Sequence, residues 1–386
     1  MHWTIIGGGV QGTTIALKLL SLGLSIHKLS IIDPHDSFCQ RFVDYAHRIE
    51  MPYLRSPIVH HVHPQPFHLK QFAKTNQYTN AFYGPYQRPE LNMFINHVKQ
   101  SVSNVDLIQC HIKDSVVGIA QYKDQWHLTL KNHQQIITDC VILAIGSTNT
   151  LHIPDVLLNK TNVNHIFDCH INDDIYPNVD HIVGSGITAA HLSLKLLKQN
   201  YDKTIHLWLN KDFEIHDFDG DPAWLGPKNM APFLKIKSMQ QRYQILMQEK
   251  HPGSMPHELY LRLKKHIKNG SIVIHRTPIK SIDSINHQII TDDEKVNYHH
   301  ILVATGFERN FMNQPLVKQL VNNCHAPLND CHYPSLNHEL EWLPNLFVAG
   351  CFADLELGPF ARNIMGGRKA AERLEQAFNK RHQHSA

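Results

Sequence analysis

The sequence predicts an α/β fold with two domains, each built on a parallel sheet. The second domain is inserted in the chain of the first, and two sets of repeated patterns support this prediction. Apolar runs at residues 4–6 and 181–183 each lead into a glycine-rich turn, at residues 7–12 and 184–189. Two other apolar runs, at residues 141–146 and 301–306, both end in Ala-x-Gly. Apolar strands that alternate with helical patterns are typical of parallel α/β units.

The two glycine-rich turns have the spacing of dinucleotide-binding motifs. In such a motif the first glycine permits a tight turn, the second lets the backbone approach a pyrophosphate, and the third lets helix and strand pack closely. The helix that follows offers unpaired N–H groups to the phosphates. We therefore expect two Rossmann-like dinucleotide-binding domains, and the motif residues are Gly7, Gly9, Val10, Gln11 and Gly12 in the first turn and Gly184, Gly186, Ile187, Thr188 and Ala189 in the second.

The residues after the second strand of each unit indicate which nucleotide binds. Asp33 lies 26 residues after Gly7 and suits a ribose diol such as that of FAD. Asn210 lies 26 residues after Gly184, and Lys211 follows it, so the second unit lacks the acid and supplies a cation. This favours NADPH, with NADH as a possible alternative. A solvated loop lysine explains Lys211 equally well.

The repeats define a domain plan. Residues 1–151 form the first part of an FAD-binding domain, residues 152–300 an inserted NAD(P)H-binding domain, and residues 301–386 the second part of the FAD-binding domain. The last part contains an apolar strand at residues 345–350 and a helix from about residue 363 to 379. Segments 34–100 and 211–256 exceed what two nucleotide domains need, and loops of that length are usually functional.

Composition excludes several other classes of protein. A net charge of +3 over 386 residues is too small to indicate nucleic-acid binding, and no apolar run is long enough to cross a membrane. A strand follows the N-terminus directly, so we expect no signal peptide. The seven cysteines include no Cys-x-x-Cys, which favours a reducing cytoplasm. The 31 histidines are scattered, and we expect no metal site; the oligomeric state stays open.

The order of these motifs resembles the two-dinucleotide-binding flavoproteins, particularly the flavin monooxygenase branch related to lysine and ornithine N-hydroxylases. The matching segments are residues 7–12, 54–57, 184–189, 304–307 and 358–363. The resemblance implies FAD, NAD(P)H and a small-molecule substrate. The sequence departs from the pattern of this group in two places. Many flavin reductases have Asp directly after the glycine that corresponds to Gly350, whereas here Cys351 follows and the first Asp is Asp354. The Cys-x-x-Cys of disulfide reductases is absent.

The resemblance places the flavin ring between residues 55–61 and 350–363. Arg55, His60 and His61 are candidates for flavin or substrate contact, with local ion pairing or capping as the alternative. Cys351 is a further candidate, although a small buried apolar role is favoured. Asp219, Asp221 and Trp224 are interpreted as a lid over the nicotinamide, or else a polar loop. The remaining predicted cofactor contacts are Ser56, Gly146, Gly306, Gly350, Gly358, Pro359 and Asn363.

The function predicted from these residues is an FAD-dependent NAD(P)H oxidoreductase, with monooxygenase-like chemistry favoured. One alternative is a flavin reductase that acts on a small disulfide or a quinone. Another is a non-catalytic FAD-binding sensor or subunit. In each enzymatic case the flavin carries the chemistry, and the protein orients it.

Overall fold

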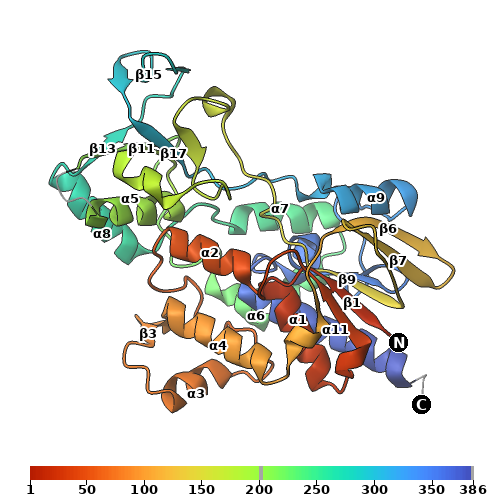
Figure 1. The fold of residues 1–386 in the computed structure, drawn as a ribbon. Helices are drawn as coiled ribbons and strands as arrows, with labels where there is room; N and C mark the ends of the chain where they lie inside the picture. The colour runs from red at the N-terminus through yellow and green to blue at the C-terminus, as the bar shows by residue number, and fades with distance from the viewer. Residues whose placement is uncertain (200–202, 384–386) are drawn as a thin grey trace.

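Two parallel sheets organise the chain, as the repeated patterns predicted (Figure 1). The computed structural model describes residues 1–199 and 203–383. The first sheet is parallel except for its antiparallel edge strand β18. Its strands, in spatial order, are β18 (Glu341–Leu343), β19 (Leu346–Val348), β9 (Cys140–Leu143), β1 (Trp3–Ile6), β2 (Leu29–Ile32) and β5 (His111–Ile112).

Helices α1 (Val10–Ser21) and α11 (Ile364–Gln383) pack against each other beside this sheet (Figure 1). The strands β1, β9 and β19 are buried along their whole length, which explains their continuous apolar sequence. The ring of Trp3 stacks on Phe347, with 5.6 Å between ring centroids. The predicted C-terminal strand and helix are confirmed, and the helix continues four residues beyond the predicted end at residue 379.

The second sheet is entirely parallel. Helices α5 (Ile187–Gln199) and α8 (His257–Lys268) pack against each other and against this sheet. A three-stranded antiparallel sheet contributes Ile282 and Ile289 to a small core with Trp208. The strands of the parallel sheet, in spatial order, are β10 (Val163–His165), β17 (His300–Val303), β11 (Val179–Val183), β12 (Ile205–Trp208) and β13 (Ile272–His275).

The two sheets repeat one plan, and this repeat changes the position of one predicted boundary. Strand β17 pairs with β11 in the second sheet, just as β9 pairs with β1 in the first. The chain therefore returns to the first sheet after residue 303, and not at residue 300 as the sequence suggested. The strands that precede β9 are β6 (Val116–Tyr122), β7 (Gln125–Leu130) and β8 (Gln135–Thr138), and those that precede β17 are β14 (Ser281–Asp283), β15 (Gln288–Ile290) and β16 (Lys295–Asn297).

Segment 34–100 is folded, and one of its helices connects the two sheets. Helix α2 (Gln40–Arg48) follows Cys39, whose N–H donates to the Gly8 carbonyl at 2.8 Å. At its other end the Arg48 carbonyl accepts from Lys195 of α5 at 2.9 Å. Helix α2 thus lies between the first glycine-rich turn and helix α5 of the second sheet (Figure 1). The other elements of this segment are α3 (His68–Thr75), β3 (Phe82–Tyr83), β4 (Arg88–Pro89) and α4 (Leu91–Ser103).

Segment 211–256 also folds into helices, and it packs on the first core although its neighbours along the chain belong to the second sheet. Its core side chains include Trp224, Met230, Phe233 and Leu246. Two ion pairs, Arg242–Glu356 and Lys250–Asp354, tie it to the C-terminal part of the chain. The helices are η5 (Pro222–Leu225), α6 (Pro227–Lys235) and α7 (Met239–Glu249).

The remaining elements are short or lie at the edges of the two units. Helix α9 (Pro315–Asn323) packs on β6. The others are α10 (Asp354–Leu357), η1 (Ile26–Lys28), η2 (Leu107–Cys110), η3 (Asp155–Leu157), η4 (Asp173–Asn178), η6 (Phe311–Asn313) and η7 (Gly350–Ala353). Within the described residues, no helix combines the length and apolarity required to span a bilayer.

Candidate functional site

The first glycine-rich turn has a different steric constraint at each glycine. Gly7 has φ +109°, and a Cβ there would lie 2.5 Å from the Ala144 carbonyl oxygen. A Cβ on Gly12 would lie 1.9 Å from the Gly7 oxygen, so α1 can approach β1 only because residue 12 is glycine. A Cβ on Gly9 would meet nothing within 4 Å. The open side of the turn is therefore at Gly9, where a pyrophosphate would approach.

Asp33 lies directly after β2, and the turn holds its carboxylate. The Gly8 N–H donates to Oδ2 at 2.7 Å, and Oδ1 contacts the His35 N–H at 2.9 Å and the His35 ring Nδ1 at 2.7 Å. A carboxylate can accept about four hydrogen bonds, so Oδ2 keeps an acceptor site for a ribose hydroxyl. This position beside the open side of the turn is the one that the spacing predicted.

Gln11 joins the start of α1 to the start of α11. Its Nε2 donates to the Asn363 carbonyl at 2.7 Å. Its Oε1 is buried and has no hydrogen-bond partner among the described residues. A buried acceptor normally has a partner, so this oxygen fits a ligand hydroxyl or a water between the two helix ends. Gly350 lies here too, since its Cβ would be 3.9 Å from Gln11 Cδ.

The C-terminal segment packs closely around Asp354. Asp354 is fully buried, and its Oδ2 accepts from Lys250 and from Arg362, each at 2.6 Å. Two cations therefore neutralise this carboxylate, while its Oδ1 has no hydrogen-bond partner among the described residues. Nearby, Gly358 has φ +78° and precedes Pro359, and a Cβ on Gly358 would lie 2.7 Å from Met230 Sδ. Glycine is thus required at this turn.

Cys351 is buried close to the other Ala-x-Gly turn. Its Sγ lies 3.7 Å from the carbonyl oxygen of Gly146, a residue with φ +69°. Burial raises the pKa of the Cys351 thiol, so the thiol stays protonated. This geometry agrees with the favoured interpretation, a small buried side chain. All seven cysteines are free.

Arg55 connects three loops. Its guanidinium donates to the His216 carbonyl at 2.7 Å and to Ser254 Oγ at 2.8 Å, and it forms an ion pair with Asp219. The second carboxylate oxygen of Asp219 accepts from Asn363 at 3.5 Å. Arg55 thus connects the loop that carries half-buried Ser56 to the segment after β12. These contacts fit the alternative of local ion pairing for Arg55.

His60 and His61 are buried and neutral. Burial lowers the pKa of His60 to about 4 and that of His61 to about 3. The His61 Nε2–H donates to the Pro66 carbonyl at 2.9 Å, while neither ring nitrogen of His60 has a partner in the described part of the chain. Both rings lie near Arg368 of α11. Neutral rings of this kind do not serve as acids near neutral pH.

The predicted lid residues have structural roles. Asp221 caps η5 through a 2.7 Å hydrogen bond from the Ala223 N–H. Trp224 is 6% exposed and packs edge-on against Phe233 in the first core. The lid interpretation is therefore wrong for Trp224, whose side chain is buried, whereas the exposed side chain of Asp221 fits the alternative, a polar loop. Asp219 lies instead where the loops of Arg55 and Asn363 meet.

The second glycine-rich turn repeats the first with one difference. Gly184 has φ +149°, and its Cβ would lie 2.6 Å from the Ala304 oxygen, as in the first turn. A Cβ on Gly186, however, would lie 3.0 Å from the Gly253 carbonyl oxygen. The loop before α8 thus covers the side that is open at Gly9. The motif residue Ala189 is buried, Ile187 and Thr188 are half-buried at the start of α5, and Gly306 has open space around its Cβ position.

Asn210 and Lys211 follow β12 as predicted. Ser185 Oγ donates to Asn210 Oδ1 at 3.3 Å. Lys211 Nζ contacts Glu214 at 2.7 Å and the Pro252 carbonyl at 3.2 Å, and its side chain is 41% exposed. Lys211 therefore already has a carboxylate partner near the second turn.

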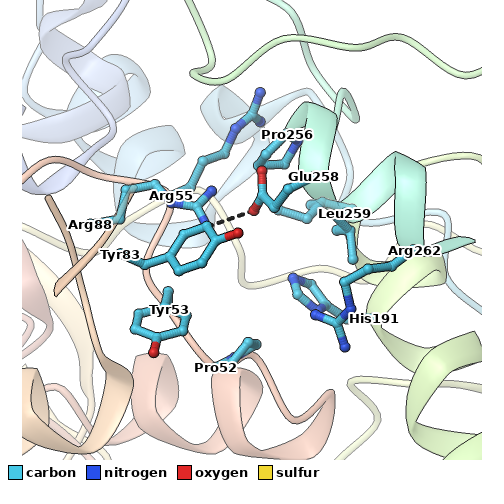
Figure 2. Close-up of a pocket in the computed structure, with 11 residues that line it drawn as sticks. Pro52, Tyr53, Arg55, Tyr83, Arg88, His191, Pro256, Glu258, Leu259 and Arg262 are labelled. Atoms are coloured by element: carbon cyan, nitrogen blue, oxygen red, sulfur yellow. Dashed lines mark hydrogen bonds and ion pairs between the residues drawn. The ribbon is translucent and has the colours of Figure 1, made fainter. Parts of the chain in front are cut away.

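Sequence reasoning missed a cavity of about 310 Å³ between the two units (Figure 2). Its charged and aromatic walls include Arg88, Arg262, Glu258 and Tyr83. The sequence indicated only a turn at Arg88-Pro89. The arginine before this proline was the only sequence signal for the cavity. Elsewhere, Asp168, Cys169 and His170 bring three potential metal-ligand atoms together at the surface.

Comparisons with known proteins agree with this geometry. A family model described as FAD-NAD(P)-binding matches residues 4–148. The structure of an ornithine N-hydroxylase from Kutzneria sp. 744 superposes with a TM-score of 0.78, at 11% identity, over 98% of this chain and 99% of that one. Ornithine hydroxylase from Pseudomonas aeruginosa gives 0.76, at 13% identity, over 98% of both chains. No curated protein matches the sequence.

A disulfide reductase has the same general fold with a lower score. Bacillithiol disulfide reductase from Bacillus cereus gives a TM-score of 0.59, at 15% identity, over 98% of this chain and 99% of that one. The chain therefore shares the α/β fold of these three structures. Its similarity to the two hydroxylases extends along nearly the whole of each chain.

Proposed function

We propose that this chain is an FAD-dependent NAD(P)H oxidoreductase with monooxygenase-like chemistry. The observation that carries the proposal is the presence of two glycine-rich turns on two parallel sheets within a fold that matches ornithine hydroxylases along its whole length. When bound, FAD would take hydride from the nicotinamide nucleotide and pass electrons to oxygen and a small substrate. The chain itself would bind the two nucleotides, orient the flavin and exclude water from it.

The first turn would hold FAD. Support comes from the open side at Gly9, the Asp33 carboxylate beside it, and the unpartnered Oε1 of Gln11 at the junction of two helix ends. The N–H groups at the start of α1 would bind the pyrophosphate. We assign the flavin contacts to the loops around Ser56, Gly146, Gly350, Gly358, Pro359 and Asn363.

The second turn would hold the nicotinamide nucleotide, with Asn210 and Lys211 near its adenosine ribose. On this assignment the FAD part comprises residues 1–151 and the chain after residue 303, together with α6 and α7. Because α6 and α7 pack on the first core, their apolar side chains would exclude water from one side of the flavin. We propose the cytoplasm as the location, since all seven cysteines are free.

The protonated, buried state of Cys351 favours monooxygenase-like chemistry over a reductase that uses this cysteine. A thiol reacts with a disulfide as the thiolate, and burial disfavours the thiolate here. The sensor alternative predicts bound FAD without turnover.

The test is oxygen incorporation. Protein loaded with FAD is mixed with NADPH, isotopically labelled oxygen and a panel of primary amines, small disulfides and quinones. The proposal expects NADPH oxidation and labelled oxygen in an amine product. NADPH oxidation that depends on a disulfide or a quinone would support the reductase instead, and bound FAD that no nucleotide reduces would support the sensor.

A further inference from the structure

The cavity between the two units lies beside the second glycine-rich turn. Ile187, the first residue of α5, forms part of its wall, and so does Pro256, which precedes the first residue of α8. Two helix N-termini therefore border one cavity. Such termini present N–H groups and partial positive charge to anions.

Arg88 lines this cavity and keeps hydrogen-bond donors to spare. It is 8% exposed, and its Nη2 donates to Glu258 Oε1 at 2.6 Å. Its guanidinium also lies 5.5 Å from the centre of the Tyr83 ring. A guanidinium has five N–H donors, and within the described residues those on Nε and Nη1 of Arg88 have no acceptor. A buried arginine with unused donors at a cavity wall fits an oxyanion.

Arg262 and His191 form the opposite wall, and Figure 2 shows their side chains next to each other. Arg262 is exposed and makes no ion pair or hydrogen bond with another described residue. His191 is 8% exposed, and its ring nitrogens likewise have no partner in the described ranges. Since Glu258 is matched by Arg88, Arg262 leaves the cavity with a positive charge.

The usual approach to the second turn is covered, whereas this cavity is open. The Gly253 carbonyl occupies the space beside Gly186, and Lys211 is held by Glu214. Arg55, which also lines the cavity, is fully engaged by its partners in the loops of Asp219 and Ser254. Arg88 and Arg262 are thus the arginines of the cavity that keep capacity for an anion.

We propose that this cavity binds a phosphate group of the nicotinamide nucleotide, held by Arg88 and Arg262 above the buried ring of His191. The inference rests on the proposed function, which supplies the nucleotide. The phosphate has two possible sources with the same oxyanion chemistry: the 2′-phosphate, which only NADPH carries, and the pyrophosphate, which NADH carries too.

Arg262→Ala tests the proposal, because this exposed side chain can be removed without opening the core. Its matched control is Lys264→Ala, an exposed cation on the same helix that only lies 5.9 Å from the Tyr260 ring. FAD-loaded protein is titrated calorimetrically with NADP+ and with NAD+. Arg262→Ala should weaken NADP+ binding about tenfold or more, and Lys264→Ala less than about twofold.

Glu258→Gln gives an independent test with the opposite sign. It removes the negative charge that competes for Arg88, so NADP+ should bind about threefold more tightly or better. A merely structural role for Glu258 predicts weaker binding instead, and weaker binding together with a lower melting temperature would count against the proposal.

The two nucleotides separate the sources of the phosphate. A loss confined to NADP+ supports the 2′-phosphate, and an equal loss for both nucleotides supports the pyrophosphate. Unchanged binding of both nucleotides in Arg262→Ala overturns the proposal. A flavin that NADPH still reduces would then leave the proposed function intact, whereas wild-type protein that binds neither nucleotide refutes both.

Discussion

Acidification should destabilise the protein because several histidines are buried as neutral rings. Burial lowers the pKa of His60, His165 and His191 to about 4 each, from an ordinary value of 6.5. Between these values the unfolded chain binds more protons than the folded protein. Stability is therefore complete above pH 6.5 and falls as the pH drops toward 4.

The size of the effect follows from the same values. At about pH 5.5, a ring with a pKa near 4 when folded and 6.5 when unfolded costs about 1.4 kcal/mol of stability. Three such rings cost about 4 kcal/mol together. This is a large fraction of the roughly 5–15 kcal/mol by which native proteins are stable.

His165→Asn isolates one of these rings. The Phe167 N–H donates to His165 Nδ1 at 3.2 Å, and an asparagine oxygen can accept in its place. Between about pH 7.5 and 5.5 the wild type and His165→Asn should both lose stability to urea. The loss in the free energy of unfolding should be about 1.4 kcal/mol smaller for His165→Asn. His332→Asn, at an exposed position with φ +58°, should behave as the wild type. Identical pH dependence of His165→Asn and wild type would refute the reasoning.

Three other predictions concern the cofactor site. Gly9→Val should fold but retain no FAD, as measured by flavin content. Gly12→Ala should lower the free energy of unfolding in urea by about 3 kcal/mol or more, because its Cβ meets the Gly7 oxygen. Lys211→Ala should narrow the preference for NADPH over NADH in flavin reduction, and a wild type that uses both equally would contradict this. Cys351→Ser should oxidise NADPH at the wild-type rate, because the thiol is buried and protonated.

The elements that could be predicted from sequence are those with local signals. The turns at Gly7 and Gly184 are recognisable because steric demands within a few residues dictate glycine, and both have positive φ in the structure. Asp33 could be placed because the length of one strand–helix–strand unit fixes its distance from Gly7. These signals give the two sheets and the open side at Gly9.

The features that could not be predicted depend on contacts between distant residues. Arg55 is held by residues more than 160 positions away, and Arg88 pairs with Glu258 at a separation of 170 residues. No local pattern encodes such partners. Trp224 was misinterpreted for the same reason, because its packing partner Phe233 belongs to a helix whose burial on the first core is a tertiary feature.

The histidines, although scattered along the sequence, include a cluster in the structure. His68 and His97 are hydrogen-bonded at 2.9 Å, and His63 stacks on His68 with 3.5 Å between centroids. These contacts join a loop to α3 and α4, and only the fold brings the rings together.

The central claim is that this fold passes electrons from a nicotinamide nucleotide to FAD. The most direct measurement mixes FAD-loaded protein with NADPH without oxygen and follows the visible absorbance of the flavin. The proposed function predicts rapid loss of the oxidised flavin band, and its return when oxygen is admitted. Protein that binds FAD but whose flavin stays oxidised with both NADPH and NADH would contradict it.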